Sequence, residues 1–93
     1  MFEWDDENRA HIARHDVTPE EAEQVLLNDP IDGGTQDHEG EERFVEVGST
    51  EALRILVVIT TQRGELTRVV TAYPASPAFR QYYASEKGMK YEQ

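Results

Sequence analysis

The side chains best suited to chemistry in this chain are two arginines in predicted strands and two histidines in a predicted helix. Arg43 and Arg68 each stand within an alternating or β-branched segment. A guanidinium is permanently charged and binds phosphate through two parallel hydrogen bonds. His11 and His15 are four residues apart, so they share one face of a helix. An imidazole can give or take a proton near neutral pH, so these residue types suit phosphate binding and proton transfer.

Both arginines also have a structural interpretation. Arg68 stands among Val, Thr and Ala, where a strand arginine needs a partner, and an ion pair with an acid from the first half of the chain would supply one. Arg43 follows Glu41 and Glu42, and a solvated charge cluster is common at a strand start. Because neighbouring strand residues point to opposite faces, only Glu41 shares a face with Arg43. Which glutamate acts with Arg43, if either does, stays open.

The histidines likewise have both a structural and a functional interpretation. His15 ends the first predicted helix, where it either interacts with the helix dipole or serves in proton transfer. The spacing of His11 and His15 can bind zinc, but no third ligand stands nearby, so no metal site is predicted. His38 lies in an acidic segment and is expected to be solvated.

Two further residues are candidates for substrate binding. Tyr73 follows the strand that holds Arg68; it either stacks on a base or donates to a phosphate, or it packs beneath the final helix. Phe79 and Tyr83 are four residues apart and form one apolar stripe of that helix. Arg80 then faces elsewhere, where it is predicted to reach a ligand.

The elements that position these residues follow from capping signals and from alternation of apolar and polar residues. Thr18-Pro19, with Glu21, and Ser76-Pro77 are strong helix starts. The predicted segments are a short strand at 2–4, a helix from Asp5 or Asp6 to about 15, a helix from 18 to about 28, a flexible loop at 31–41 with room for one short strand, strands at 43–47, 53–61 and 66–73, a helix from 76, and a frayed tail at 88–93.

This order, β-α-α-β-β-β-α, predicts a single α+β domain over residues 1–93. Short connections between the last three strands imply a small antiparallel sheet, with the helices packed on one face. The other face of the sheet is then left for a ligand or a partner.

The net charge of −10 argues against a general nucleic-acid binder. The acidic excess lies entirely in residues 1–50, which carry −12, whereas residues 51–93 carry +2. A local cationic surface built from the second half is therefore compatible with the total. The absence of cysteine excludes disulfides and thiolate metal sites. No apolar segment is long enough to span a membrane, and a cytoplasmic location is expected.

Taken together, the chain resembles the BrnT toxins, which are ribonuclease-type members of the RelE/ParE superfamily of type II toxin–antitoxin systems. The order and spacing of several short segments carry this resemblance. They are Phe2-Glu3-Trp4-Asp5 with Asn8, Arg14-His15-Asp16-Val17, Glu20-Glu21-Ala22, Asp29-Pro30, Gly40-Glu41-Glu42-Arg43, Leu56-Val57-Val58, Arg68-Val69-Val70-Thr71-Ala72, and a final helix with Arg80 and Tyr83.

The resemblance implies a metal-independent endoribonuclease that uses no cofactor. In such cleavage the ribose 2′-OH attacks the adjacent phosphate while a base, an acid and cations assist. His15, Arg43 and Arg68 are the catalytic candidates, and Tyr73 and Arg80 are the substrate-binding ones. The implied partner is a BrnA-like antitoxin with a ribbon-helix-helix domain, through which alone the toxin would meet DNA.

The sequence also departs from the family pattern. Tyr73-Pro74 stands where the family has a second arginine, and the first helix carries Arg9 and Arg14 in place of lysines. These changes, with the acidic total, leave a second hypothesis open: a catalytically weakened protein-binding module on the same fold, with no ribonuclease activity.

Overall fold

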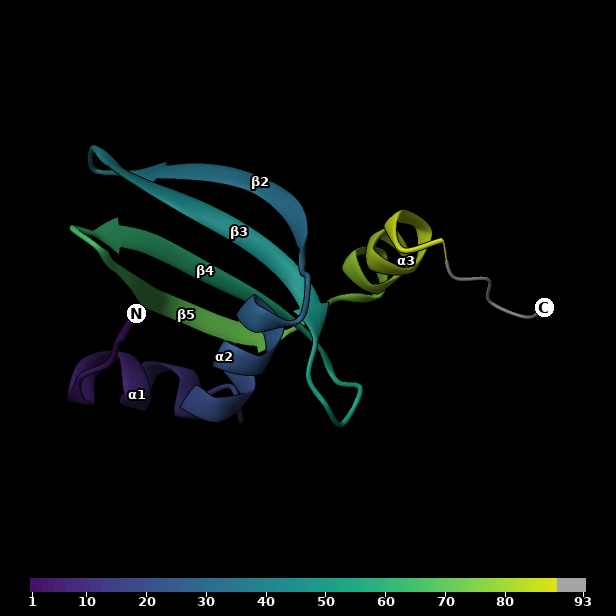
Figure 1. Ribbon diagram of the computed structural model, residues 1–93, viewed down its shortest axis with the longest axis horizontal. Coiled ribbons are helices and arrows are strands. Elements are labelled where there is room, and N and C mark those ends of the chain that lie inside the picture. The colour runs from purple at the N-terminus through teal and green to yellow at the C-terminus, as the bar shows by residue number, and fades with distance from the viewer. Residues whose placement is uncertain (89–93) are drawn as a thin grey trace.

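The computed structural model describes residues 1–88 and contains one five-stranded sheet with three helices (Figure 1). The elements, in chain order, are β1 (Phe2–Glu3), α1 (Asp6–Ala13), α2 (Pro19–Leu27), β2 (Ile31–His38), β3 (Glu41–Ser49), β4 (Ile55–Arg63), β5 (Leu66–Pro74) and α3 (Pro77–Glu86). The strand order is β1-β5-β4-β3-β2. The tail predicted to fray lies outside the described residues except for Gly88.

The helix starts are where the capping signals predicted them. Asp5 caps α1 by accepting from the backbone amide of Asn8, and the Asn8 side chain accepts from the Asp5 amide in return. Thr18 and Glu21 form the same reciprocal box at α2, and Ser76 caps α3. Each cap satisfies backbone N–H groups that have no partner within the helix, so these positions can be predicted from local sequence.

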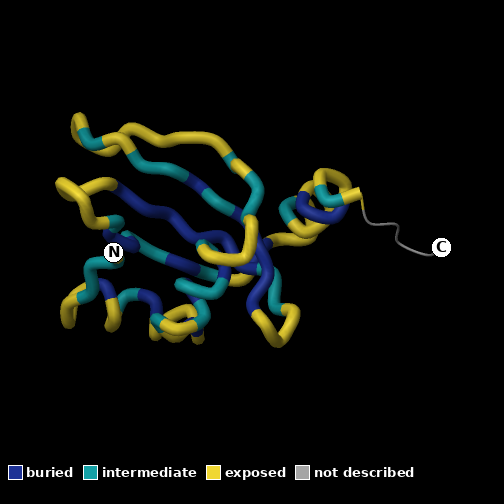
Figure 2. Tube along the Cα trace, viewed as in Figure 1, coloured by how far each residue is buried: buried dark blue, intermediate teal, exposed yellow. Residues whose placement is uncertain are grey.

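The prediction of a mostly flexible loop over residues 31–41 was wrong, although it left room for a strand, and the strand that is present spans eight residues. Residues 31–38 form the edge strand β2, which pairs with β3 along its length, with a bulge between Asp32 and Gly34. Figure 2 shows that β2 is exposed over most of its course. Glycine and aspartate disfavour strands, but the backbone hydrogen bonds to β3 outweigh this preference, and they come from a contact that local sequence does not reveal.

The sheet is mixed and not purely antiparallel. β1 pairs in parallel with β5, with Phe2 beside Thr67 and Glu3 beside Arg68. β3, β4 and β5 pair antiparallel, as predicted, and β2 adds a further antiparallel pair with β3. The parallel pair places the acidic start of the chain directly beside Arg68.

Apolar clusters lie on both faces of the sheet. One face, called here the helix face, packs against α1 and α2; its buried cluster consists of Ile12, Val17, Ala22, Val25, Leu56, Val58, Val69 and Ala72. The opposite face, called here the cleft face, holds a second cluster of Val45, Val47, Val57, Ile59, Ala75 and Tyr83, and α3 packs there.

The prediction that all helices pack on one face was therefore wrong for α3. This helix begins shortly after β5 ends, and its Phe79–Tyr83 stripe is buried against the cleft-face cluster. Figure 1 shows α3 at one end of the sheet, far from α1, so the other end of the cleft face stays uncovered. No helix within residues 1–88 has the length and apolar character needed to cross a membrane.

Candidate active site

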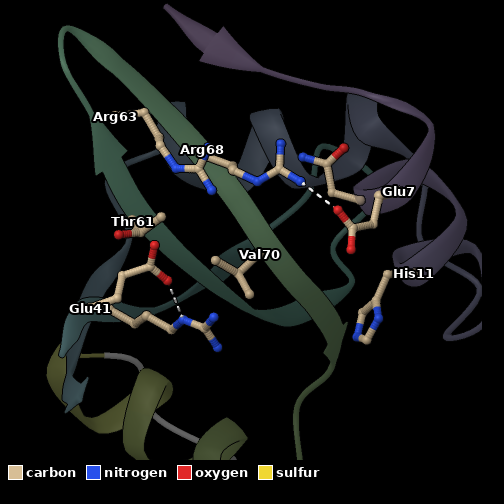
Figure 3. Close-up of a pocket in the computed structure, with 9 residues that line it drawn as sticks. Glu7, His11, Glu41, Thr61, Arg63, Arg68 and Val70 are labelled. Carbon is tan, nitrogen blue, oxygen red and sulfur yellow. Dashed lines mark hydrogen bonds and ion pairs between the residues drawn. The ribbon is translucent and has the colours of Figure 1, made fainter. Parts of the chain in front are cut away.

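A cleft of about 330 Å³ lies on the uncovered end of the cleft face (Figure 3). α1, whose Ile12 packs on the helix face, also contributes Glu7, Asn8 and His11 to its wall, and the other lining residues come from β3, β4 and β5. The lining residues are Glu7, Asn8, His11, Glu41, Arg43, Thr61, Arg63, Arg68 and Val70. The predicted arginines Arg43 and Arg68 are both among them.

A β-bulge brings Arg68 onto the same face as the other arginines. On β5, Tyr73 pairs with Val57 and Arg68 pairs with Thr61, while Val70 is the extra residue between the shifted registers. Val57 and Thr61 lie on the same face of β4 because they are separated by an even number of positions. Without the extra residue, Arg68 and Tyr73 would point to opposite faces, so the bulge determines the composition of the cleft.

Arg68 is buried, with 8% of its surface exposed, and it lies among three carboxylates. Its Nη1 and Nη2 atoms lie 2.9 and 3.3 Å from the Asp5 oxygens, and Glu7 and Glu3 lie 3.5 and 3.7 Å away. The bond to Asp5 raises the pKa of the Arg68 guanidinium and holds the pKa of the Asp5 carboxyl below its usual range. The structural interpretation of Arg68, an ion pair with first-half acids, is thus present in the fold.

The other two arginines of the cleft are less engaged. Arg43 donates from Nε to Glu41 at 3.0 Å, which confirms that Glu41 is the glutamate on its face. Among residues 1–88, the Nη atoms of Arg43 have no hydrogen-bond partner. Arg63 is exposed and lies 4.0 Å from Glu3. Arg63 was not predicted, because the strand expected at 53–61 ended before it, whereas β4 extends to Arg63, which has the same strand parity as Thr61.

Asn8 holds α1 beside this face. It is 2% exposed, and its Nδ2 donates to the carbonyls of Glu3 at 3.0 Å and Val69 at 2.9 Å. These bonds join the first turn of α1 to β1 and β5. They keep Glu7 and His11 on the side of the helix that faces the strands, as Figure 3 shows. The role of Asn8 was not predicted, although Asn8 is among the residues that carry the resemblance to the BrnT toxins.

The histidine in the cleft is His11, not the predicted His15. The His15 ring lies beside the cleft, with its centroid 5.7 Å from that of His11 and 5.9 Å from that of Tyr73. Tyr73 packs against the cleft-face cluster, which includes Tyr83 of the final helix. α1 ends at Ala13, so His15 lies in the turn after the helix, and the four-residue spacing could not tell that only His11 of the two would line the cleft.

Arg80 does not line the cleft. It is exposed on α3, and its Nη1 donates to the Ala75 carbonyl at 2.9 Å. Within the described part of the chain, no group of three or more His, Cys, Asp or Glu side chains is placed to hold a metal ion.

The cleft therefore combines three guanidinium groups, one imidazole and two carboxylates. Guanidinium groups bind phosphate and stabilise charge that develops on it. Imidazole and carboxylate groups can exchange protons with hydroxyl groups held beside them. This set of residues is suited to a reaction at a phosphodiester.

A family model described as "Ribonuclease toxin, BrnT, of type II toxin-antitoxin system" matches residues 4–78, a span that includes every residue of the cleft. No curated protein matches the chain.

Proposed function

The chain belongs to the BrnT family of ribonuclease toxins of type II toxin–antitoxin systems, and on this premise we propose that it is a metal-independent endoribonuclease. The main observation behind this proposal is a cleft lined by three arginines from neighbouring strands and by one histidine of α1. These residues are Arg43, Arg63, Arg68 and His11. We further propose that the fold is of the RelE/ParE type.

The proposed reaction is an attack of the ribose 2′-oxygen on the adjacent phosphorus. The bond from phosphorus to the 5′-oxygen breaks, leaving a 2′,3′-cyclic phosphate and a free 5′-hydroxyl. A base takes the 2′-OH proton, and an acid protonates the departing oxygen. Arg43 and Arg63 bind the phosphate, since each guanidinium group has a single carboxylate partner and can still donate to a ligand. Arg68, which also lines the cleft, stays paired with Asp5 and adds positive charge near the phosphate.

His11 is proposed as one of the two proton-transfer groups, and Glu7 or Glu41 as the other, because these groups line the cleft. His15 contacts the His11 ring, so it is proposed to orient that ring. Tyr73 and Arg80 stay predicted contacts for nucleotides beyond the reacting phosphate. The Tyr73 side chain packs against the cleft-face cluster, and Arg80 belongs to α3, which packs on that face.

The test uses the purified chain on total RNA in the presence of EDTA. Arg43→Ala and His11→Ala are expected to lower the cleavage rate by about 10²-fold or more. Arg9→Ala is the matched control, because Arg9 is exposed on α1 and does not line the cleft. His15→Phe retains a ring beside His11 and is expected to keep most of the activity. Products with 2′,3′-cyclic phosphate ends would support the mechanism.

A second candidate function is a protein-binding module without ribonuclease activity. It is favoured by the acids around the cleft, since Glu3, Asp5, Glu7 and Glu41 all lie within 4.0 Å of its arginines. If the chain neither degrades RNA nor arrests growth when induced, and Arg68→Ala changes nothing, the enzyme proposal must be abandoned in favour of this one.

The proposed partner is a BrnA-like antitoxin with a ribbon-helix-helix domain. The family implies an antitoxin, and the charge of −12 on residues 1–50 suits a basic segment of it. Gel filtration after co-expression with the neighbouring gene product tests this. A chain that elutes alone, with no companion gene beside its own, would contradict the assignment of a partner.

A further inference from the structure

A second hollow, of about 460 Å³, lies on the helix face, opposite the cleft. Residues at the C-terminal end of α2 form part of its wall, and the rest comes from the start of the chain and from β3, β4 and β5. Its lining residues are Met1, Phe2, Leu26, Leu27, Phe44, Glu46, Thr60, Gln62 and Thr67. None of these residues lines the cleft.

The rim of this hollow exposes large apolar side chains. Met1 is 75% exposed and Leu27 is 67% exposed, and Phe2, Leu26 and Phe44 are half-buried beside them. A contiguous group of exposed apolar side chains with polar residues around it is typical of a contact surface. Covering them with another apolar side chain removes area from water, which is favourable.

Unneutralised acids flank the apolar rim. Glu46 lines the hollow and pairs across the strands with Asp32, and Glu42 pairs with Asp37 on the same face. Like charges directly opposite each other destabilise a sheet. Within residues 1–88 none of these four carboxylates is in a salt bridge. Burial, followed by the charge of Asp32, raises the pKa of Glu46, as expected for a carboxylate with no cation beside it.

The two faces of the sheet therefore differ in charge. Alternate residues of β3 and β4 send Arg43 and Arg63 to the cleft face and Glu42 and Glu46 to the helix face. Acids would repel an RNA backbone from the second hollow. Their charge fits a cationic ligand, and the apolar rim fits a side chain of the same ligand.

We propose that this hollow is a docking surface for a basic, amphipathic segment of a partner protein. One apolar side chain of the segment inserts between Leu27 and Phe44, and a lysine or arginine next to it meets Glu46 and Asp32. The occupant and the RNA contact opposite faces of the sheet. The inference rests on the proposed function only in taking this partner to be the antitoxin, because the surface itself needs no nuclease activity.

The probe is a short peptide of alternating leucine and lysine, titrated into the ¹⁵N-labelled chain. Amide shifts are expected at Leu27, Phe44, Glu46 and Thr67, and not at the arginines of the cleft. Peptides with serine in place of leucine, or glutamate in place of lysine, are expected to bind at least about tenfold more weakly. Shifts confined to the cleft, or equal binding of all three peptides, would overturn the proposal.

Two pairs of variants separate a specific site from general attraction to an acidic protein. Leu27→Ser is expected to weaken peptide binding by about tenfold or more, whereas Leu53→Ser, at a leucine that is 81% exposed elsewhere, should change it less than about twofold. Glu46→Gln should weaken binding and reduce its salt dependence, with Glu65→Gln as its control. If both members of either pair behave alike, the site is not the one proposed.

Two further measurements separate this inference from other outcomes. Peptide binding is repeated with Arg43→Ala, since a variant without nuclease activity should bind the peptide as the wild type does. Loss of cleavage with retained peptide binding would show that the two proposals stand independently.

Gel filtration of the chain alone tests whether a second copy of the chain occupies the hollow instead. A dimer that Leu27→Ser dissociates, together with no peptide binding, would assign the hollow to a second copy and overturn the proposal.

Discussion

Replacing Asn8 with alanine is expected to weaken the attachment of α1 to the sheet more than any cap substitution would. The side chain is 2% exposed and takes part in three hydrogen bonds that alanine cannot make. Nδ2 donates to the carbonyls of Glu3 and Val69, at 3.0 and 2.9 Å, and Oδ1 accepts from the Asp5 amide at 2.8 Å. The bond from the Asn8 amide to Asp5 survives, because it uses only the backbone of residue 8.

The expected cost follows from these bonds. Each hydrogen bond contributes about 0.5–1.5 kcal/mol net to stability, with about 1 kcal/mol as a typical value. The loss of a bond to a buried carbonyl that is left without a donor lies at the upper end of that range. The loss of three bonds therefore lowers the free energy of unfolding by about 3 kcal/mol. In a domain of this size, that corresponds to a fall in Tm of about 12–24 °C. Asn8→Asp should cost more, since it places a carboxylate against the carbonyls of Glu3 and Val69.

Urea denaturation followed by circular dichroism measures the change. Asn28→Ala is the matched control, because its side chain makes one hydrogen bond, to the Ser49 carbonyl at 3.2 Å, from an exposed position. Its expected cost is about 1 kcal/mol or less. If Asn8→Ala costs no more than Asn28→Ala, Asn8 does not attach α1 to the sheet. Cleavage measured at a temperature where Asn8→Ala is folded should also fall, because Glu7 and His11 lose their position at the cleft.

The remaining predictions concern pH. Burial, with the charge of Asp32, raises the pKa of Glu46 above its ordinary value, so the contribution of Glu46 to stability is full at acidic pH and is lost as pH rises through the folded pKa. Glu46→Gln should therefore raise the free energy of unfolding at about pH 7 and have little effect near pH 4, and an equal effect at both values would contradict this. The hydrogen bond from Arg68, followed by that from the Asn8 amide, lowers the pKa of Asp5, so its contribution is present above the unfolded pKa and is lost as pH falls through the folded value. Asp5→Asn should flatten the decline of Tm below about pH 4; a decline as steep as that of the wild type would assign the acid sensitivity to other groups.

Much of the fold could be predicted because its signals are local. Thr18 and Glu21 form a capping box within four consecutive residues, and Ser76 caps α3 in the same way. The apolar segment that became β4 and the alternation that became β3 needed no knowledge of their neighbours. The face shared by Glu41 and Arg43 also followed from strand parity alone.

Features that depend on distant partners were missed. β2 is a strand because β3 supplies hydrogen bonds along it, and its own residues favour turns. α3 packs on the cleft face because β5 ends next to an apolar cluster there, which the helix stripe then covers. The segment of β2 carries no strand pattern, and the apolar stripe of α3 shows that the helix packs but not on which face.

Arg43 and Arg68 show the same contrast between what local sequence determines and what distant contacts decide. Their residue types, and their place in strands, were determined by the sequence, as was the need of a buried Arg68 for an acid. Only the tertiary structure decided that the acid is Asp5, since the parallel pairing of β1 with β5 brings the start of the chain beside Arg68. It also decided, through the bulge at Val70, that Arg68 shares a face with Arg43. The physical reason is that one extra residue reverses the parity of a strand, and a bulge depends on pairing with the neighbouring strand.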